Sequence, residues 1–209
     1  MFLLFLLNII LSVFFGILVI LTKYDIRLDK LNKLSIFLLY LFSLTIPFWN
    51  QIRMWAAYDF YDANHFLIYG VIYPIFGFPT FIFGMLNFFK IVHQNEEATN
   101  GKNTTPQLLI TSGFYAKMRH PMYAMIIIFD LAWHITFGSI CGFLSALVVS
   151  LIFIYDARRE EKKQLIPKFG EEYLIYCKEV PVRFFTRNLS ILIIILLFLG
   201  ISGTLLEII

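Results

Sequence analysis

The chain has 209 residues, of which 59% are hydrophobic, 18% are aromatic and only 15% are charged. An ordinary soluble domain carries about 25% charged residues, so this composition excludes a soluble globule. The net charge of +3 comes from 17 basic and 14 acidic residues, and this near balance, without a clustered basic patch, gives no reason to expect nucleic acid as a partner.

Long uncharged runs predict that the chain crosses a membrane several times. A helix needs roughly 20 apolar residues to cross about 30 Å of hydrocarbon. The first run is expected to remain as a helix, since no Lys or Arg precedes it and no small-residue cleavage site follows it. The third contains Pro74, Gly77, Pro79 and Gly84, which predict a kink or close helix packing. The runs cover residues 1–22, 34–52, 63–89, 131–155 and 188–206.

The apolar block at residues 122–155 is too long for one crossing, because a straight helix of that length would span about 51 Å. Gly138, Ser139 and Gly142 near its middle favour a break. We therefore expect a tight helical hairpin of residues 120–137 and 140–156. The predicted fold is all-α, a polytopic membrane bundle of about six transmembrane helices with a cytoplasmic amphipathic segment.

The basic residues predict the orientation of the bundle. With six crossings and both termini outside, 16 of the 17 Lys and Arg residues fall on one face, which the positive-inside rule makes cytoplasmic. We divide the chain into residues 1–106, which hold three membrane helices and a polar loop at 95–105, a motif region at 107–187, and a last membrane helix at 188–209.

The first stretch with chemical potential runs from Leu109 to Tyr123. A Gly turn leads to Tyr115, and Arg119, His120 and Pro121 stand at the mouth of a membrane helix. Pro suits a first helical turn, where backbone N–H groups are unpaired and can bind the polar parts of a ligand. An interfacial anchor would show the same residue types.

The second stretch, from Asp156 to Pro181, is charged and predicts a cytoplasmic helical segment. Pro167 and Gly170 should break it into two pieces. An apolar side can pack on the membrane surface or on a bound ligand, although simple structural amphipathicity explains it equally well. That side consists of Leu165, Ile166, Phe169, Tyr173, Leu174 and Tyr176.

Taken together, residues 107–184 resemble the isoprenylcysteine carboxyl methyltransferase and phospholipid methyltransferase superfamily. The matching motifs stand in the family's order: Thr-Ser-Gly-x-Tyr at 111–115, Arg-His-Pro-x-Tyr at 119–123, Glu-Glu at 160–161, Phe-Gly-Glu-Glu-Tyr at 169–173, Tyr176, and Val-Pro at 180–181. The resemblance implies S-adenosyl-L-methionine as cofactor. The family's cofactor contacts would fall on Gln107, Leu108, Leu109, Ile110, Tyr115, His120, Pro121, Met122, Tyr123 and Glu161.

The resemblance also implies a lipophilic acceptor that enters from the membrane, with the carboxylate of a prenylated cysteine as the leading candidate. No catalytic residue is assigned, and the candidates for positioning the acceptor are Arg119, Arg158 and Arg159. The alternatives are a phospholipid amine methyltransferase, a nicotinamide-dependent sterol-reductase-like enzyme and a non-catalytic membrane scaffold. Two positions depart from the family: Met125 replaces a common Gly, and Ala157 replaces an Arg of isoprenylcysteine enzymes.

Two ionisable residues lie inside the hairpin's first helix. Asp130 and His134 are four residues apart and so share a face, where such groups are costly unless they are paired or line a cavity. We interpret them first as an interhelical pair. The two cysteines, Cys141 and Cys177, predict neither a disulfide framework nor a metal site.

Overall fold

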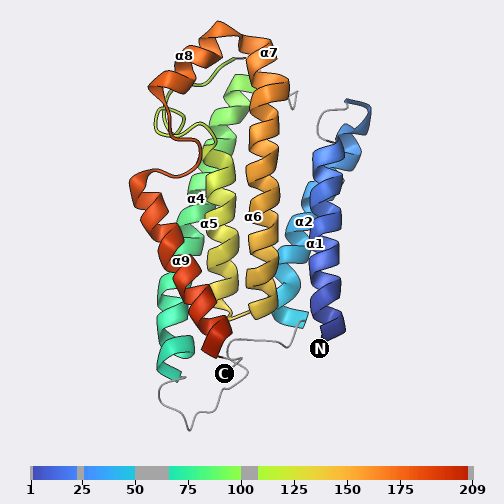
Figure 1. Cartoon of the computed structure of the whole chain (residues 1–209), viewed down its shortest axis with the longest axis vertical. Coiled ribbons are helices and arrows are strands. Elements are labelled where there is room, and N and C mark those ends of the chain that lie inside the picture. Colours follow the sequence, from blue (N-terminus) through green and yellow to red (C-terminus); the bar gives the residue numbers. More distant parts are fainter. Residues whose placement is uncertain (1, 23–25, 50–65, 100–107, 207–209) are drawn as a thin grey trace.

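The computed structural model describes residues 2–22, 26–49, 66–99 and 108–206. These residues form an elongated bundle without a β-strand (Figure 1). Short helical pieces are η1 (Ile26–Leu28), η2 (Phe66–Ile72), η3 (Glu161–Leu165), α7 (Ile166–Phe169) and α8 (Glu171–Glu179). The long helices are α1 (Phe2–Thr22), α2 (Asp29–Trp49), α4 (Tyr73–Thr99), α5 (Pro121–Thr136), α6 (Ile140–Glu160) and α9 (Arg187–Leu206).

The predicted all-α membrane bundle is confirmed. Four segments are long and apolar enough to cross a bilayer, namely Lys30–Phe48, Gly70–Asn95, Ile140–Phe169 and Arg187–Leu205. Two shorter apolar helices, Ile9–Thr22 and Pro121–Thr136, lie beside them. The total of six crossings stays a prediction. Residues 95–99 were expected in a loop, but they extend α4 instead, and the rest of that loop lies outside the described residues.

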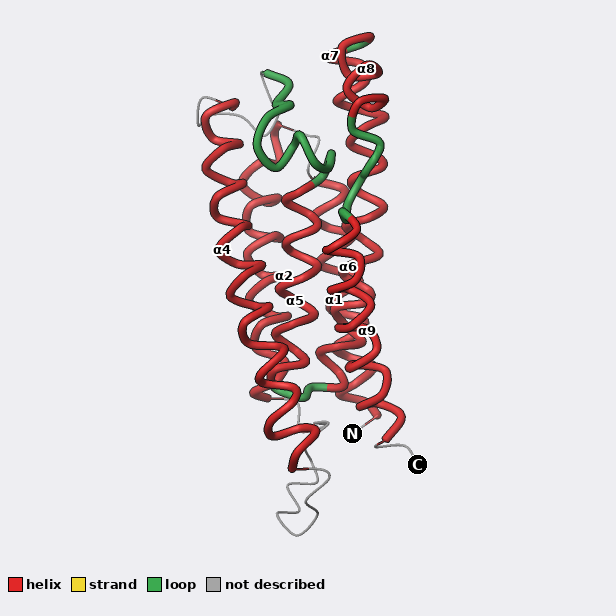
Figure 2. Tube along the Cα trace, turned by 90° about the vertical axis from the view of Figure 1, so that its left-hand side faces the viewer, coloured by secondary structure: helices red, strands yellow, loops and turns green. Residues whose placement is uncertain are grey.

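Helix α5 forms the centre of the bundle. It is predominantly apolar and buried on nearly every side, and it packs against α2, α4, α6 and α9. A helix that is hydrophobic all round is stable only when neighbours surround it. Figure 2 shows the long helices running side by side, with α7 and α8 at the end of the bundle opposite both termini.

The predicted hairpin between α5 and α6 is present, and local chemistry explains its turn. Gly138 has φ of 56°, a left-handed conformation that suits glycine after a helix end. Its N–H bonds to Ile135 O at 3.0 Å, and the N–H of Ser139 bonds to His134 O at 2.9 Å. Ser139 then caps α6, because its hydroxyl accepts from the N–H of Gly142 at 3.1 Å.

Glycines in α4 serve close packing against α5. A Cβ on Gly77 would lie 2.8 Å from the backbone N of Thr136, and one on Gly84 would lie 2.9 Å from Cβ of Phe129. Small residues let membrane helices approach in this way. Of the two readings of this Gly/Pro-rich run, these contacts support close packing.

The charged segment is broken into two helical pieces, as predicted, but the break falls at Gly170 and not at Pro167. Gly170 does end α7, with φ of 53°. Pro167 breaks nothing, because it occupies the first turn of α7, directly after the π-helical segment η3. A first-turn position has no need of the N–H that Pro lacks.

The close contact between the two arms of the hairpin makes Gly142 sensitive to substitution. A Cβ there would lie 2.0 Å from Nδ1 of the buried His134 ring. We expect Gly142→Ala to lower the free energy of unfolding by about 1–3 kcal/mol through overpacking. Thermal unfolding in detergent measures this loss. Gly16→Ala is the matched control, since its nearest contact is the flexible end of Ile152, and an equal loss in both variants would contradict the explanation.

Candidate functional site

Three basic side chains contact the buried carboxylate of Glu161 at one end of the bundle. His120 Nε2 lies 3.1 Å from Oε1, and Arg119 Nε lies 3.3 Å from the same oxygen. Arg183 donates from Nε to Oε1 at 3.2 Å and from Nη2 to Oε2 at 2.9 Å. A buried charge is costly unless it is paired and hydrogen-bonded, so this arrangement stabilises Glu161 in its place.

Backbone hydrogen bonds fix the segments that carry these basic groups. The N–H of Arg119 donates to Val182 O at 3.0 Å, and the N–H of His120 donates to Arg183 O at 2.9 Å. The chain just before α9 therefore runs beside the start of α5. Pro121 begins α5 directly after this pairing.

A cavity of about 350 Å³ opens next to the basic cluster. Its volume lies within the range of small-molecule sites. Most of the residues that line the cavity come from the two motif stretches. They are Leu108, Leu109, Ile110, Tyr115, Arg119, His120, Met122, Tyr123, Asp156, Glu160, Leu165, Phe169, Tyr173 and Tyr176. The cavity thus brings both stretches of the sequence to one place.

The end of the cavity toward the bundle core is apolar. Ile126 and Phe153 come from the hairpin, and Phe88 comes from α4. Helices α1 and α2 also line the cavity, with the apolar Val19 and Ile36, with Tyr40, and with the polar Asn32 near the start of α2. The amide of Asn32 donates to Val19 O and to Thr22 Oγ1, both at 2.9 Å, so it ties α2 to α1.

Two acidic residues line the cavity between these ends. The Tyr123 hydroxyl lies 2.9 Å from Asp156 Oδ2 and 2.8 Å from Glu160 Oε2. Both carboxylates come from α6, four residues apart on one face. The wall therefore carries basic groups at one place and acidic groups at another.

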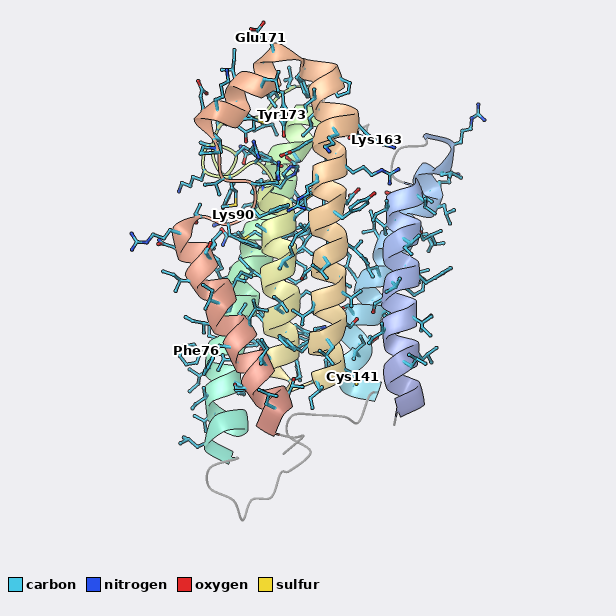
Figure 3. The ribbon with its side chains drawn as sticks, in the orientation of Figure 1. Phe76, Lys90, Cys141, Lys163, Glu171 and Tyr173 are labelled. Atoms are coloured by element: carbon cyan, nitrogen blue, oxygen red, sulfur yellow. The ribbon has the colours of Figure 1, made fainter. Side chains whose placement is uncertain are left out.

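The loop before α5 is fixed by tyrosine hydroxyls. Tyr115 donates to Asn95 Oδ1 on α4 at 2.7 Å, and Tyr176 on α8 donates to Tyr115 O at 2.7 Å. Burial raises the pKa of Tyr115, Tyr173 and Tyr176 above the usual phenol value, so these hydroxyls remain neutral at physiological pH. In Figure 3 Tyr173 lies on the side of α8 toward the long helices, whereas Glu171 points outward.

The structure places the predicted cofactor residues as follows. Leu108, Leu109, Ile110, Tyr115, His120, Met122 and Tyr123 line the cavity. Glu161 and Pro121 do not line it, but Glu161 bonds to His120, which does. Gln107 lies outside the described residues. Whether these residues contact a cofactor stays a prediction.

The three arginines predicted to position the acceptor lie in different surroundings. Arg119 lines the cavity while it is paired to Glu161. Arg158 is exposed on α6 and does not line the cavity. Arg159 donates from Nη1 to Ile20 O at 2.9 Å, which ties α6 to α1. Of the three, Arg119 is the one placed at the cavity wall.

The residues expected on the apolar side of the charged segment point in two directions. Leu165, Phe169, Tyr173 and Tyr176 face the cavity. Ile166 and Leu174 are exposed on the outside, where they can contact lipid. The segment therefore presents apolar residues both to the cavity and to the outside.

The two departures from the family motif are buried in packing. Met125 is 1% exposed and packs in a cluster with Ile91, Met118 and Ile128. Ala157 is completely buried in a cluster with Val19 and Phe153. Neither residue lines the cavity.

The sequence predictions did not include several parts of the site, namely Arg183, Asn95, the acidic pair Asp156 and Glu160, and the wall from α1 and α2. Arg183 stands two residues after the Val180–Pro181 motif, so this motif could have indicated that Arg183 belongs to the site. Asn95 is one polar residue in a polar stretch, and no local pattern marked it.

Comparisons with known proteins agree with the motif positions. Residues 76–172 match the family model described as "Phospholipid methyltransferase". This part of the chain is similar to membrane methyltransferases, which supports the superfamily that the motifs indicated. The human protein-S-isoprenylcysteine O-methyltransferase is 41% identical over 88 residues, which cover 42% of this chain and 30% of the relative.

More distant matches extend over the same share of the chain. The protein-S-isoprenylcysteine O-methyltransferase of Schizosaccharomyces pombe is 35% identical over 83 residues, 38% of this chain and 34% of the relative. The mouse Delta(14)-sterol reductase is 31% identical over 81 residues, 38% of this chain and 19% of the relative. The matched part thus spans about a third or less of these relatives. No solved structure matches the chain.

The hydrogen bond from Tyr115 to Asn95 should stabilise the loop over the cavity. We expect Asn95→Ala and Tyr115→Phe to show a coupling of about 1 kcal/mol in a double-mutant cycle, because either change removes the same bond. Equilibrium unfolding in mixed detergent micelles gives the four free energies. Strictly additive losses would show that the bond contributes nothing.

Proposed function

We propose that this protein is an integral membrane methyltransferase that uses S-adenosyl-L-methionine and methylates a lipophilic acceptor. One observation carries the proposal: the motif residues of the matched family region gather around a single cavity with a polar end and an apolar end. A polar cofactor and a lipid-like acceptor need such a pair of environments within reach of each other.

The lining residues fit the chemical parts of this cofactor. Arg119 and His120 suit its carboxylate, and the carboxylates of Asp156 and Glu160 suit its positive charges. Tyrosine rings, such as that of Tyr115, suit a flat base or attract a sulfonium cation. When bound, S-adenosyl-L-methionine supplies an electrophilic methyl group. Glu161 acts as a positioning residue in this proposal, because it holds Arg119 and His120.

The protein's own contribution is alignment and exclusion of water. Methyl transfer is an in-line displacement, and correct placement of two reactants lowers the barrier by removing their freedom of motion. Phe88, Ile126 and Phe153 exclude water from the apolar end of the cavity. The acceptor would enter laterally from the membrane, and the cofactor from the cytoplasmic face.

The prenylated cysteine carboxylate is the leading acceptor, since two of the three relatives named above are protein-S-isoprenylcysteine O-methyltransferases. A carboxylate is already a nucleophile and requires no base. The acidic pair Asp156 and Glu160 supports a second candidate, the amine of a phospholipid, because carboxylates attract a cationic headgroup and accept its proton. Because a sterol reductase is among the matches, a nicotinamide-dependent enzyme remains the alternative that the binding experiment must distinguish from a methyltransferase.

Cofactor binding tests the proposal directly. We expect the detergent-purified protein to bind S-adenosyl-L-methionine saturably in calorimetry. Glu161→Gln should weaken binding by at least about tenfold, or roughly 1.4 kcal/mol, because Arg119 and His120 lose the charge that positions them. The matched control is Lys162→Gln, an exposed neighbour. The proposal would be overturned if the folded wild-type protein bound reduced nicotinamide adenine dinucleotide phosphate instead of S-adenosyl-L-methionine.

The product identifies the acceptor class. With a radiolabelled methyl donor, we expect a farnesylated cysteine analogue to become methylated, with label that base releases as methanol, since esters hydrolyse. Label that resists base in phosphatidylethanolamine would select the amine. Labelling of neither compound by a protein that binds the donor would contradict both candidates.

A further inference from the structure

A cluster of polar side chains lies between α2 and α5, inside the bundle and outside the cavity. Ser43, Asp130 and His134 are all buried, with at most 2% of each residue exposed. Ser43 Oγ lies 2.8 Å from Asp130 Oδ1 and 3.1 Å from His134 Nε2. Asp130 Oδ1 is also 3.5 Å from His134 Nε2. The cofactor and acceptor proposals assign no role to this cluster.

The direction of these hydrogen bonds follows from the number of protons. The Ser43 hydroxyl has one proton, which it donates to Asp130 Oδ1. His134 Nε2 must therefore be the donor toward Ser43 Oγ, so the chain of bonds runs from His134 through Ser43 to Asp130. Ser43 is the central member, because it alone bonds to both residues of α5.

The geometry excludes a nucleophilic triad despite the residue types. In a triad, the carboxylate bonds to the histidine nitrogen opposite the one that faces the serine. Here Asp130 lies on the Nε2 side, and among the described residues Nδ1 has no hydrogen-bond partner. A Cβ on Gly142 would lie 2.0 Å from this Nδ1, so the ring packs directly against α6. The cluster instead joins helices.

Ionisable groups at membrane depth are costly unless they are paired. Separation of α2 from α5 would leave the carboxylate of Asp130 and the ring of His134 without Ser43 in hydrocarbon. A second bond ties the same helices, since Trp133 Nε1 donates to Leu44 O at 2.9 Å. These contacts therefore favour one fixed position of α2 along α5.

The same face of α2 forms part of the cavity. Asn32, Ile36 and Tyr40 are spaced four residues apart, so they share a helix face, and all three line the cavity. Ser43 continues this face, three residues after Tyr40. A shift or rotation of α2 would therefore move the cavity wall and the Ser43 contact together.

We infer that Ser43, Asp130 and His134 form an intramembrane lock that sets the position of α2 and thereby the shape of the acceptor half of the cavity. These three are positioning residues, since none lines the cavity. The lock follows from the contacts alone, whereas its effect on an acceptor rests on the proposed function. The cofactor end, which α5, η3 and the segment before α9 support, should be independent of the lock.

Spin-label distances between α2 and α4 test the lock without any assay of activity. Nitroxides at Leu41→Cys and Leu86→Cys, both exposed positions, report the distance in lipid nanodiscs after replacement of Cys141 and Cys177 by Ser. We expect a narrow distance distribution in this background and a broader or shifted one for Ser43→Ala. Asp130→Asn provides a second variant of nearly the same volume.

The matched control is Ser35→Ala on the same helix. Ser35 is also buried, but its hydroxyl donates to Leu31 O within α2, so its removal breaks no bond between helices. The control should keep the background distribution. Unchanged distributions in both Ser43→Ala and Asp130→Asn would overturn the lock, as would equal broadening in Ser35→Ala.

Kinetics and calorimetry connect the lock to the cavity. With the farnesylated cysteine analogue, Ser43→Ala should raise the acceptor KM by about threefold or more, with kcat and donor affinity retained. A fall in kcat or donor affinity with the acceptor KM unchanged would overturn the assigned role. Failure of the wild type to bind the donor would refute the proposed function, while the spin-label result would still decide the lock.

Discussion

The pairing of the buried Glu161 carboxylate is the interaction on which the functional end of the molecule depends. Two segments distant in sequence supply its partners, namely the residues directly before α5 and the chain before α9, while Glu161 itself begins η3 after α6. A carboxylate removed from water must be paired, so these segments have to meet at one point. Once they meet, the loop before α5 and helix α8 are close enough to enclose the cavity through the bond from Tyr176 to Tyr115.

The hydrocarbon environment imposes a similar requirement on the rest of the bundle. No water can satisfy polar groups there, so every polar side chain needs a protein partner. The structure meets this need with few and specific contacts between helices, such as Ser43 with Asp130 and Trp133 with Leu44 O. Apolar helices slide easily against one another in lipid, because they gain little from burial there. Such contacts therefore specify which faces meet.

The sequence predicted best what is determined locally. The turn at Gly138 and Ser139 could be found because glycine conformation and serine capping act within a few residues. The family motifs predicted that Tyr115, His120 and Tyr123 lie at one site, and all three line the cavity. Pro167 was misjudged, because its effect depends on whether it falls in a first turn or a helix interior. Contacts such as Asn95 with Tyr115 join residues 20 apart, and no periodicity specifies them.

The division of the cavity between two parts of the chain has a consequence for how specificity can change. The family match covers residues 76–172, whereas Val19, Asn32, Ile36 and Tyr40 precede it. Substitutions in α1 and α2 can therefore reshape the apolar end without touching the basic cluster at Glu161. Such freedom requires that α2 be held by something other than the cavity itself. The buried contact of Ser43 with α5 meets that requirement at a point three residues beyond the cavity wall.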